Sequence, residues 1–295
     1  MKVFEVAPGI TRIESTLGPR PFAQYLLRDE RSLLVDTGVK DTPAEVILPA
    51  LDGLAPDFVL ISHADVDHFG GSYAIGEAAP NALFCAHAAD VPWIESAERI
   101  MSERYGWYEA YGIGYPPETF QWLRDAMGPD VPVDIHLRGG EVFRLGNSLS
   151  VEILHLPGHS PGHIGVWEPH SRSAVVTDAM MASGLLDTEG NVVHPPPIVD
   201  VAGYEGSVRL LQSLEPELLL TAHYDVIEGA DVGRFLDESL AFVERARRVV
   251  AANGDLPLGE LLERANAELG LFTSMPNELA ATLRAILIEQ GREPR

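Results

Sequence analysis

Four short apolar segments, each followed by a potential metal ligand, constrain the fold of this chain more than any other feature of its sequence. FVLIS, SVEILHLPG, SAVVT and ELLLTA lead into His63, His159, Asp178 and His223. Side chains at strand ends leave the core but stay rigidly held, so such ends commonly form binding sites in α/β proteins. Three further candidates follow the first segment: Asp65, Asp67 and His68. Because imidazole and carboxylate groups bind zinc, iron and manganese, the seven residues together predict a metal site.

Strands and helices are mixed along the chain, which is typical of an α/β protein. Apolar runs and alternation predict strands at residues 22–27, 32–38, 57–62, 141–145, 148–156, 164–169, 173–178 and 217–223. Helical periodicity predicts helices at residues 204–213, 231–252, 258–269 and 276–290. The tetrapeptide TPAE at 42–45 has the capping-box pattern, with Thr42 as the cap, and predicts a helix that ends near Leu51.

The chain carries 21 basic and 44 acidic residues, which is a net charge of −23. A surface with this excess of acid repels phosphate backbones, so nucleic acid is not expected as a partner. No segment approaches the roughly 18 apolar residues of a membrane span, and the opening MKVFEVAPG lacks the features of a signal peptide. The single cysteine, Cys85, excludes an internal disulfide. These features predict a cytoplasmic protein without a membrane partner.

Residues 88–135 form a helix-like segment that is rich in aromatic side chains. The segment holds eight of the chain's 22 aromatic residues within 30 positions. Because it follows the first candidate ligands, it could fold over the metal site as an apolar wall for a small-molecule substrate. Alternatively, its aromatic residues could form a small core of their own or a homodimer contact.

Four motifs resemble those of the metallo-β-lactamase-fold hydrolases. HADVDHFGG at 63–71 matches the family's first motif, His-x-His-x-Asp-His followed by Gly-Gly, except at Asp65. LPGHSPGH at 156–163 resembles the second histidine motif, TDAM at 177–180 the bridging aspartate, and TAHYD at 221–225 the last histidine. The resemblance extends over about residues 3–250 and implies a four-layer αββα sandwich with a two-metal site at one edge. The chain would then comprise a metallo-β-lactamase-like domain at 1–252, with the helical insertion 88–135, and a C-terminal helical extension at 253–295.

The resemblance also implies a ligand set for two divalent metal ions. One ion would be held by His63, Asp65 and His159. The other would be held by Asp67, His68 and His223, with Asp178 bridging the two. Asp67 would in addition orient a metal-bound hydroxide, which makes it the catalytic candidate. Zinc is the expected metal, with iron and manganese as alternatives.

Asp65 stands where the commoner motif has a histidine. With aspartate at this position, three carboxylates and one hydroxide would balance the charge of two divalent ions, whereas histidine would leave one positive charge. The site should therefore be less Lewis acidic and more oxygen-rich, which shifts the expected preference toward iron or manganese. The pattern resembles the His-x-Glu-x-Asp-His variant of flavodiiron proteins.

Two other histidines are weaker candidates. His163 would lie beside the metal ligands and support them, or else be an exposed histidine of a turn. His194, in the segment HPPP, would contact substrate or else lie on a surface loop. The two C-terminal helices resemble the extension of hydroxyacylglutathione hydrolases, but residues 254–295 hold four arginines against seven acids and show no basic site for glutathione carboxylates.

The sequence therefore predicts a binuclear metal-dependent hydrolase that cleaves an ester, thioester, lactone or related acyl bond through a metal-bound hydroxide. The alternative is an iron-dependent redox enzyme, flavodiiron-like or dioxygenase-like, on the same fold. The absence of a recognisable flavin domain counts against the flavodiiron version. A binding protein on a catalytically inactive fold is a third interpretation, and the presence of all seven candidates argues against it.

Overall fold

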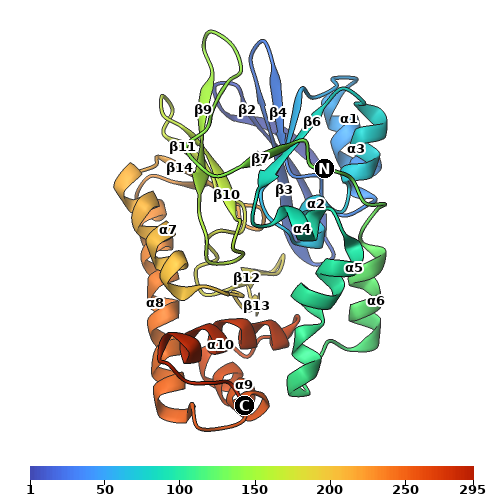
Figure 1. Cartoon of the computed structure of the whole chain (residues 1–295). Helices are drawn as coiled ribbons and strands as arrows, with labels where there is room; N and C mark the ends of the chain where they lie inside the picture. Colours follow the sequence, from blue (N-terminus) through green and yellow to red (C-terminus); the bar gives the residue numbers. More distant parts are fainter.

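Two β-sheets pack face to face between outer helices. The structure, a computed structural model, describes residues 1–295. Helices α7 (Val201–Leu214) and α8 (Ala230–Asn253) lie outside one sheet, and α1 (Leu48–Leu51) and α3 (Ser72–Ala78) lie outside the other (Figure 1). This arrangement confirms the α/β sandwich of four layers that the sequence predicts.

The first sheet has seven strands, which follow one another in sequence order. They are β1 (Lys2–Ala7), β2 (Ile10–Leu17), β3 (Arg20–Arg28), β4 (Ser32–Val35), β5 (Phe58–Ile61), β6 (Leu83–His87) and β7 (Ile135–Leu137). Strands β1 to β4 pair antiparallel, whereas β4 to β7 pair parallel. The strands predicted at 22–27, 32–38 and 57–62 are confirmed as β3, β4 and β5. No strand was assigned from the sequence to β1, β2, β6 or β7.

The second sheet has six strands in the order β15-β14-β11-β10-β9-β8. They are β8 (Val142–Arg144), β9 (Ser150–His155), β10 (Ile164–Glu168), β11 (Ser173–Val175), β14 (Leu218–Leu220) and β15 (Ile227–Glu228). Because β10 is antiparallel to both β9 and β11, and β11 is parallel to β14, strands β9, β11 and β14 run in one direction. Their C-terminal ends therefore meet at the same edge, and the loops that follow carry His159, Asp178 and His223.

The central strands are buried on both faces, which explains their continuous apolar sequence. In β5, Leu60 belongs to the core between the two sheets, whereas Val59 and Ile61 belong to the core between the first sheet and its helices. Strand β4 divides in the same way, with Leu33 facing one core and Leu34 the other. Side chains alternate between the faces of a strand, so both faces must be apolar where two layers cover the sheet.

The hairpin of β12 (Leu185–Leu186) and β13 (Val192–His194) and the C-terminal helices lie below the sheets in Figure 1, whereas α2 (Val66–Phe69) and α4 (Val91–Ile94) lie beside the lower ends of the strands. Segment 88–135 contains α4, α5 (Ala97–Ile100), η2 (Met101–Tyr105), η3 (Trp107–Tyr111) and α6 (Pro117–Asp125). The short strands β12 and β13 form a separate hairpin, and α2 follows β5. The C-terminal elements are α9 (Leu258–Leu269), η4 (Pro276–Glu278) and α10 (Leu279–Glu289). None of the helices combines the length and apolar character needed to cross a membrane.

The predicted capping box at Thr42 is wrong, although the helix does end at Leu51 as expected. Thr42 makes no capping hydrogen bond, and the chain after it forms one π-helical turn, η1 (Pro43–Ile47), before α1. The backbone of Thr42 is already helical, with φ −55° and ψ −40°. A capping residue normally has extended geometry, which aims its side chain at the first free N–H groups. Asp200 has this geometry and accepts a hydrogen bond from Gly203 N (3.0 Å) at the start of α7.

We expect Asp200→Ala to lower the free energy of unfolding by about 1 kcal/mol, because it removes a side-chain cap. Thr42→Val keeps the shape of the side chain and removes only the hydroxyl, so it should change this free energy by less than about 0.5 kcal/mol. Urea unfolding of both variants beside wild type measures the difference. An equal loss of stability in the two variants would show that Thr42 does act as a cap.

Candidate metal centre

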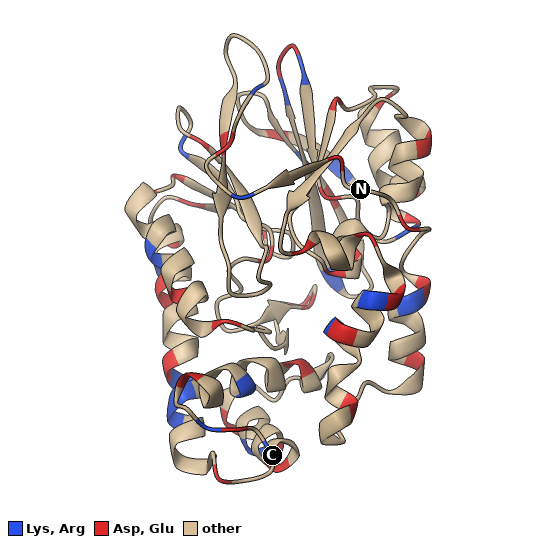
Figure 2. Ribbon diagram, viewed as in Figure 1, with Lys and Arg blue, Asp and Glu red and all other residues tan.

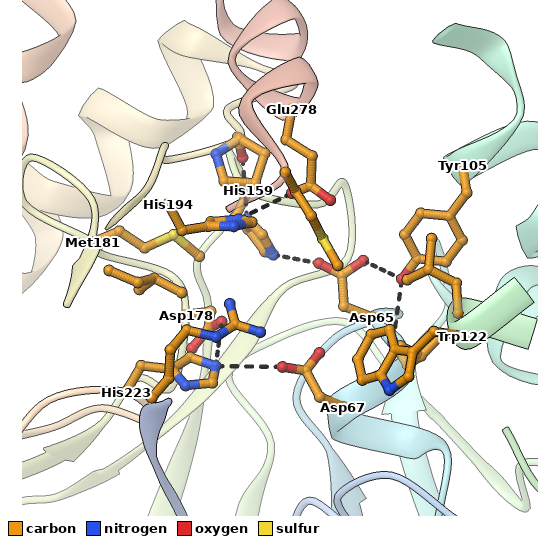
Figure 3. A pocket seen from close by; sticks show the side chains of 16 residues that line it. Asp65, Asp67, Tyr105, Trp122, His159, Asp178, Met181, His194, His223 and Glu278 are labelled. Carbon is orange, nitrogen blue, oxygen red and sulfur yellow. Dashed lines mark hydrogen bonds and ion pairs between the residues drawn. The ribbon is translucent and has the colours of Figure 1, made fainter. Parts of the chain in front are cut away.

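All seven candidate ligands meet at the edge of the sandwich where the strands of the second sheet end. Their donor atoms form three groups in which every atom lies within 4.8 Å of the others. The groups are His63–His68–Asp178, His63–Asp65–His159 and Asp67–His68–His223. Figure 3 shows Asp65 and Asp67 on one side of the pocket, with His159, Asp178 and His223 facing them. The last two groups are the two terminal ligand sets implied by the sequence, and Asp178 lies beside members of both.

The four imidazole rings are all held through Nδ1, which leaves Nε2 for the centre. The partners of Nδ1 are Ser62 Oγ for His63 (3.0 Å), Asp36 Oδ2 for His68 (2.7 Å), Pro197 O for His159 (3.0 Å) and Pro21 O for His223 (2.9 Å). The Nε2 atoms of His63, His68 and His223 are buried and have no hydrogen-bond partner. Buried polar atoms without a partner are costly, and an imidazole oriented through its second nitrogen is the usual metal ligand.

The spacing of the donor atoms fits metal ions. Nε2 of His68 and Nε2 of His223 each lie 3.4 Å from Asp178 Oδ2, and His223 Nε2 is also 3.4 Å from Asp67 Oδ2. Ligand atoms at 2.0–2.1 Å from a tetrahedral ion lie about 3.3–3.4 Å from one another. The residues present therefore suit divalent ions in both geometry and donor type.

Protonation at this edge also favours cation binding. Burial and the neighbouring His68 lower the pKa of His63 to about 4, so its imidazole is neutral and has a free lone pair. Burial alone would raise the pKa of the Asp178 carboxyl, but His223 and His68 lower it well below its usual range. Burial likewise opposes charge on His68, yet Asp36, Asp178 and Asp67 raise its pKa well above the usual value. The carboxylates therefore stay ionised and attract positive charge, as protons or as metal ions.

Asp65 is paired with a cation that sequence reasoning missed. Arg104 Nη2 lies 3.1 Å from Asp65 Oδ2, and the hydroxyl of Tyr105 donates to Oδ1 (2.9 Å). His159 Nε2 also approaches Oδ2, at 2.9 Å. Arg104 is only 3% exposed and adds a positive charge beside Asp65 that the charge count from the sequence did not include. The sequence did contain one signal for such a cation. Asp65 places a negative carboxylate where the family motif has a neutral imidazole, and a nearby positive charge would compensate it.

Asp90 joins two of the loops that carry the candidate ligands, and it too was missed. Its buried carboxylate accepts hydrogen bonds from Ala64 N (3.0 Å), Ser160 Oγ (2.6 Å) and Gly162 N (2.7 Å). The loop after β5 and the loop after β9 are thus tied to one side chain. This arrangement holds His63 and His159 at a constant separation.

The loop around His223 is held by a buried arginine. Arg12 donates to Tyr25 Oη (2.5 Å) and to Tyr224 O (2.6 Å), and the hydroxyl of Tyr25 donates to Thr221 O (2.6 Å). Arg12 and Tyr25 are fully buried in β2 and β3. Residues of the first sheet therefore position His223, which lies in a loop of the second sheet.

His163 and His194 are both buried, so the alternatives of an exposed turn and a surface loop are wrong. The ring of His163 stacks on His63 with centroids 4.5 Å apart, and its Nε2 lies 3.2 Å from Thr177 Oγ1. His194 lines the pocket over the candidate ligands, and its Nε2 lies 3.1 Å from Glu278 Oε2. Burial follows from packing between distant segments, which local polarity does not reveal.

The aromatic segment 88–135 contributes both to the pocket and to the apolar core. Tyr105, Trp122 and Leu123 line the pocket over the candidate ligands, as a substrate wall would. Tyr108 and Tyr115 are buried in the larger apolar core with Tyr105. The segment therefore shares the larger apolar core and also reaches the candidate ligands, whereas the substrate wall and the homodimer contact stay predictions.

Comparison with known proteins decides the family. The family profile described as "Metallo-beta-lactamase superfamily" matches residues 17–223. The chain belongs to this superfamily. Members of the metallo-beta-lactamase superfamily bind divalent metals, and this chain is a metal-dependent hydrolase of that kind, in agreement with the sequence prediction.

Relatives within the superfamily share about a quarter of their residues with this chain. The probable metallo-hydrolase YflN of Bacillus subtilis (strain 168) is 25% identical over 243 residues, which cover 75% of this chain and 85% of YflN. The acyl-coenzyme A thioesterase MBLAC2 of Bos taurus is 24% identical over 229 residues, which cover 74% of this chain and 70% of MBLAC2. A beta-lactamase domain protein from Burkholderia ambifaria has the same fold, with a TM-score of 0.73 at 21% identity over 98% of this chain and 88% of that one.

Elemental analysis after loading with zinc, manganese or iron should find about two ions per chain, because the candidates comprise two terminal sets and one bridge. Asp178→Ala removes the carboxylate beside both sets, so it should retain about one ion or fewer. The exposed Asp41→Ala is the matched control and should retain both. Saturation of wild type at one ion under every loading would contradict a binuclear site.

The buried pair of Asp65 and Arg104 yields a stability test in metal-free protein. Asp65→Asn leaves the guanidinium buried without its counter-ion and should lower the free energy of unfolding by about 3–5 kcal/mol. Replacing both residues, with Asp65→Asn and Arg104→Met, should restore part of that loss. Urea unfolding in the presence of a chelator measures the four proteins of this cycle. A single Asp65→Asn variant as stable as wild type would exclude a strong pair.

Proposed function

We propose that this enzyme uses two metal ions to hydrolyse an ester, thioester, lactone or related acyl bond of a small molecule. The observation that carries the proposal is the convergence of imidazole Nε2 atoms and carboxylates at one pocket. Each terminal set of three candidate ligands would hold one ion, with Asp178 between the two sets. Zinc is the first choice of metal, with iron and manganese as alternatives.

The pocket above the candidate ligands is narrow. Its volume of about 40 Å³ has room for about three water molecules, which limits it to the reacting group of a substrate. Apolar side chains form part of its wall: Trp122, Leu123, Met181, Leu185 and Met275. Such a wall beside a charged floor suits an acyl bond that adjoins an apolar chain.

Bound divalent ions would lower the pKa of a water molecule and polarise the oxygen of the substrate carbonyl. Asp67 lines the pocket, and its carboxylate accepts a hydrogen bond from the attacking water and orients it. The water oxygen forms the new bond to the acyl carbon, the bond to the leaving oxygen or sulfur breaks, and one proton passes to the leaving group. The hydrogen bond of His223 to Pro21 O keeps the imidazole fixed beside Asp67 throughout.

The names of the relatives favour hydrolysis over the redox alternative. MBLAC2 is an acyl-coenzyme A thioesterase and YflN a probable metallo-hydrolase. These names support acyl thioesters as the first substrates to test. The homodimer and the cytoplasmic location expected from the sequence stay predictions.

A panel of acyl esters, thioesters, lactones and phosphodiesters, assayed with metal-loaded protein, tests the proposal. We expect acyl hydrolysis that a chelator abolishes. Asp67→Asn should lower kcat by about 10²–10⁴-fold, since the orienting carboxylate is lost. The exposed Asp52→Asn serves as the matched control and should retain wild-type rates. Turnover of phosphodiesters alone, or metal-dependent oxidation without hydrolysis, would overturn the assignment.

A further inference from the structure

We propose that Arg20 binds an anionic group of the substrate, so that the preferred substrate is an acyl compound with a carboxylate or phosphate close to the scissile bond. The proposal rests on the proposed function, because it concerns the substrate class of the same site. Arg20 is the first residue of β3 and follows the turn at Gly18 and Pro19.

The guanidinium of Arg20 has no partner in the protein and is accessible from the pocket. The residue is only 9% exposed. No carboxylate oxygen lies within 4.0 Å of its nitrogens, and its side chain makes no hydrogen bond to the protein. An arginine carries a positive charge and five N–H donors, which can bind an anion directly. The side chain is therefore available to a ligand anion that enters the pocket.

Arg20 lies where two compartments join. The inner compartment of about 40 Å³ contains the candidate metal ligands, and an outer one of about 330 Å³ adjoins it. Both are lined by Arg20, Trp122 and Met275. No other lysine or arginine lines either compartment. A substrate that reaches the metal site through the outer compartment therefore passes this guanidinium.

The acids around the pocket have cationic or imidazole partners other than Arg20. Asp65 is paired with Arg104, and Glu278 is bonded to His194. The chain as a whole has a net charge of −23, and acidic segments outnumber basic ones across the ribbon (Figure 2). Most of the surface therefore repels anions, so selection of an anionic substrate requires a local cation inside the pocket.

The sizes of the compartments place the anionic group relative to the reacting bond. The inner compartment, about 40 Å³, is much smaller than the outer one, about 330 Å³, so most of the substrate lies in the outer one. There it meets Leu17, Pro19 and Val193 as well as Trp122. An anion at Arg20 thus lies a few atoms from the acyl carbon, where the planar guanidinium can bind a carboxylate or a phosphate through two parallel hydrogen bonds.

Matched substrates test the proposal directly. Three acyl thioesters are compared: one that ends in a free carboxylate, its neutral methyl ester, and one that carries a phosphate. The measured quantity is kcat/KM for each anionic substrate divided by kcat/KM for the neutral methyl ester. Wild type should prefer an anionic substrate. Arg20→Met should reduce that preference by about 10–100-fold, mainly through KM, which is the size expected for a charge-assisted pair. Arg20→Lys should keep an intermediate preference.

Arg28→Met is the matched control, because Arg28 ends the same strand, is exposed and makes the same change of charge. Its preference should equal that of wild type. The anionic substrate whose kcat/KM ratio falls more in Arg20→Met, the carboxylate or the phosphate, identifies the anion that Arg20 binds. Metal content and thermal midpoint of each variant establish that it is folded.

An equal ratio in wild type and Arg20→Met would overturn the proposal, because the metal ions alone would then select the anion. A wild-type preference for the neutral ester would do the same. If wild type hydrolyses none of the substrates, the proposed function fails by itself. Calorimetric binding of succinate and of inorganic phosphate to metal-loaded wild type and Arg20→Met then decides the role of Arg20. Equal binding by both proteins, or none by wild type, would count against it.

Discussion

Repulsion among three carboxylates, of which Asp178 is buried and the other two are partly buried, is the constraint on which the metal centre depends. Asp65, Asp67 and Asp178 stay together because positive charge is placed around them: Arg104 against Asp65, and imidazoles or metal ions against the other two. Each imidazole is oriented through its Nδ1, which directs its Nε2 toward the centre. Hydrogen bonds within the protein therefore set the orientation of these candidate ligands.

The sheets supply the second requirement, which is to bring ligands from distant parts of the chain to one edge. Three strands of the second sheet run in the same direction, and the loop after β5 joins them from the first sheet. Two side chains link these sources. Asp90 ties the β5 loop to the β9 loop, and Arg12 reaches from β2 to the loop of His223. Because these links are buried and charged, the sheets cannot shift without exposing or unpairing them.

Much of the fold and the candidate ligands could be predicted from the sequence, because both have local signals. An apolar run followed by His63 or His223 can be recognised within a few residues of sequence. The continuous apolar sequence of the central strands indicates burial on both of their faces. The partners of these residues have no local signal. Arg104 meets Asp65 from 39 positions away, and His194 meets Glu278 across 84. The capping box at Thr42 has the expected residue types, but its backbone is helical and not extended, so the side chain does not cap the helix. The residue types alone do not reveal this backbone geometry.

The wall of the pocket is formed by segments that lie far apart in the sequence and are therefore synthesised at different times. Glu278, at the end of η4, accepts a hydrogen bond from Tyr115 and is bonded to His194, and Met275 lines both compartments. Synthesis runs from the N-terminus, so all seven candidate ligands precede these two residues. A nascent chain can thus acquire its metal-binding edge before the enclosure that selects substrates exists. During synthesis the chain therefore passes through a stage that contains all seven candidate metal ligands but not the residues that complete the wall of the substrate pocket.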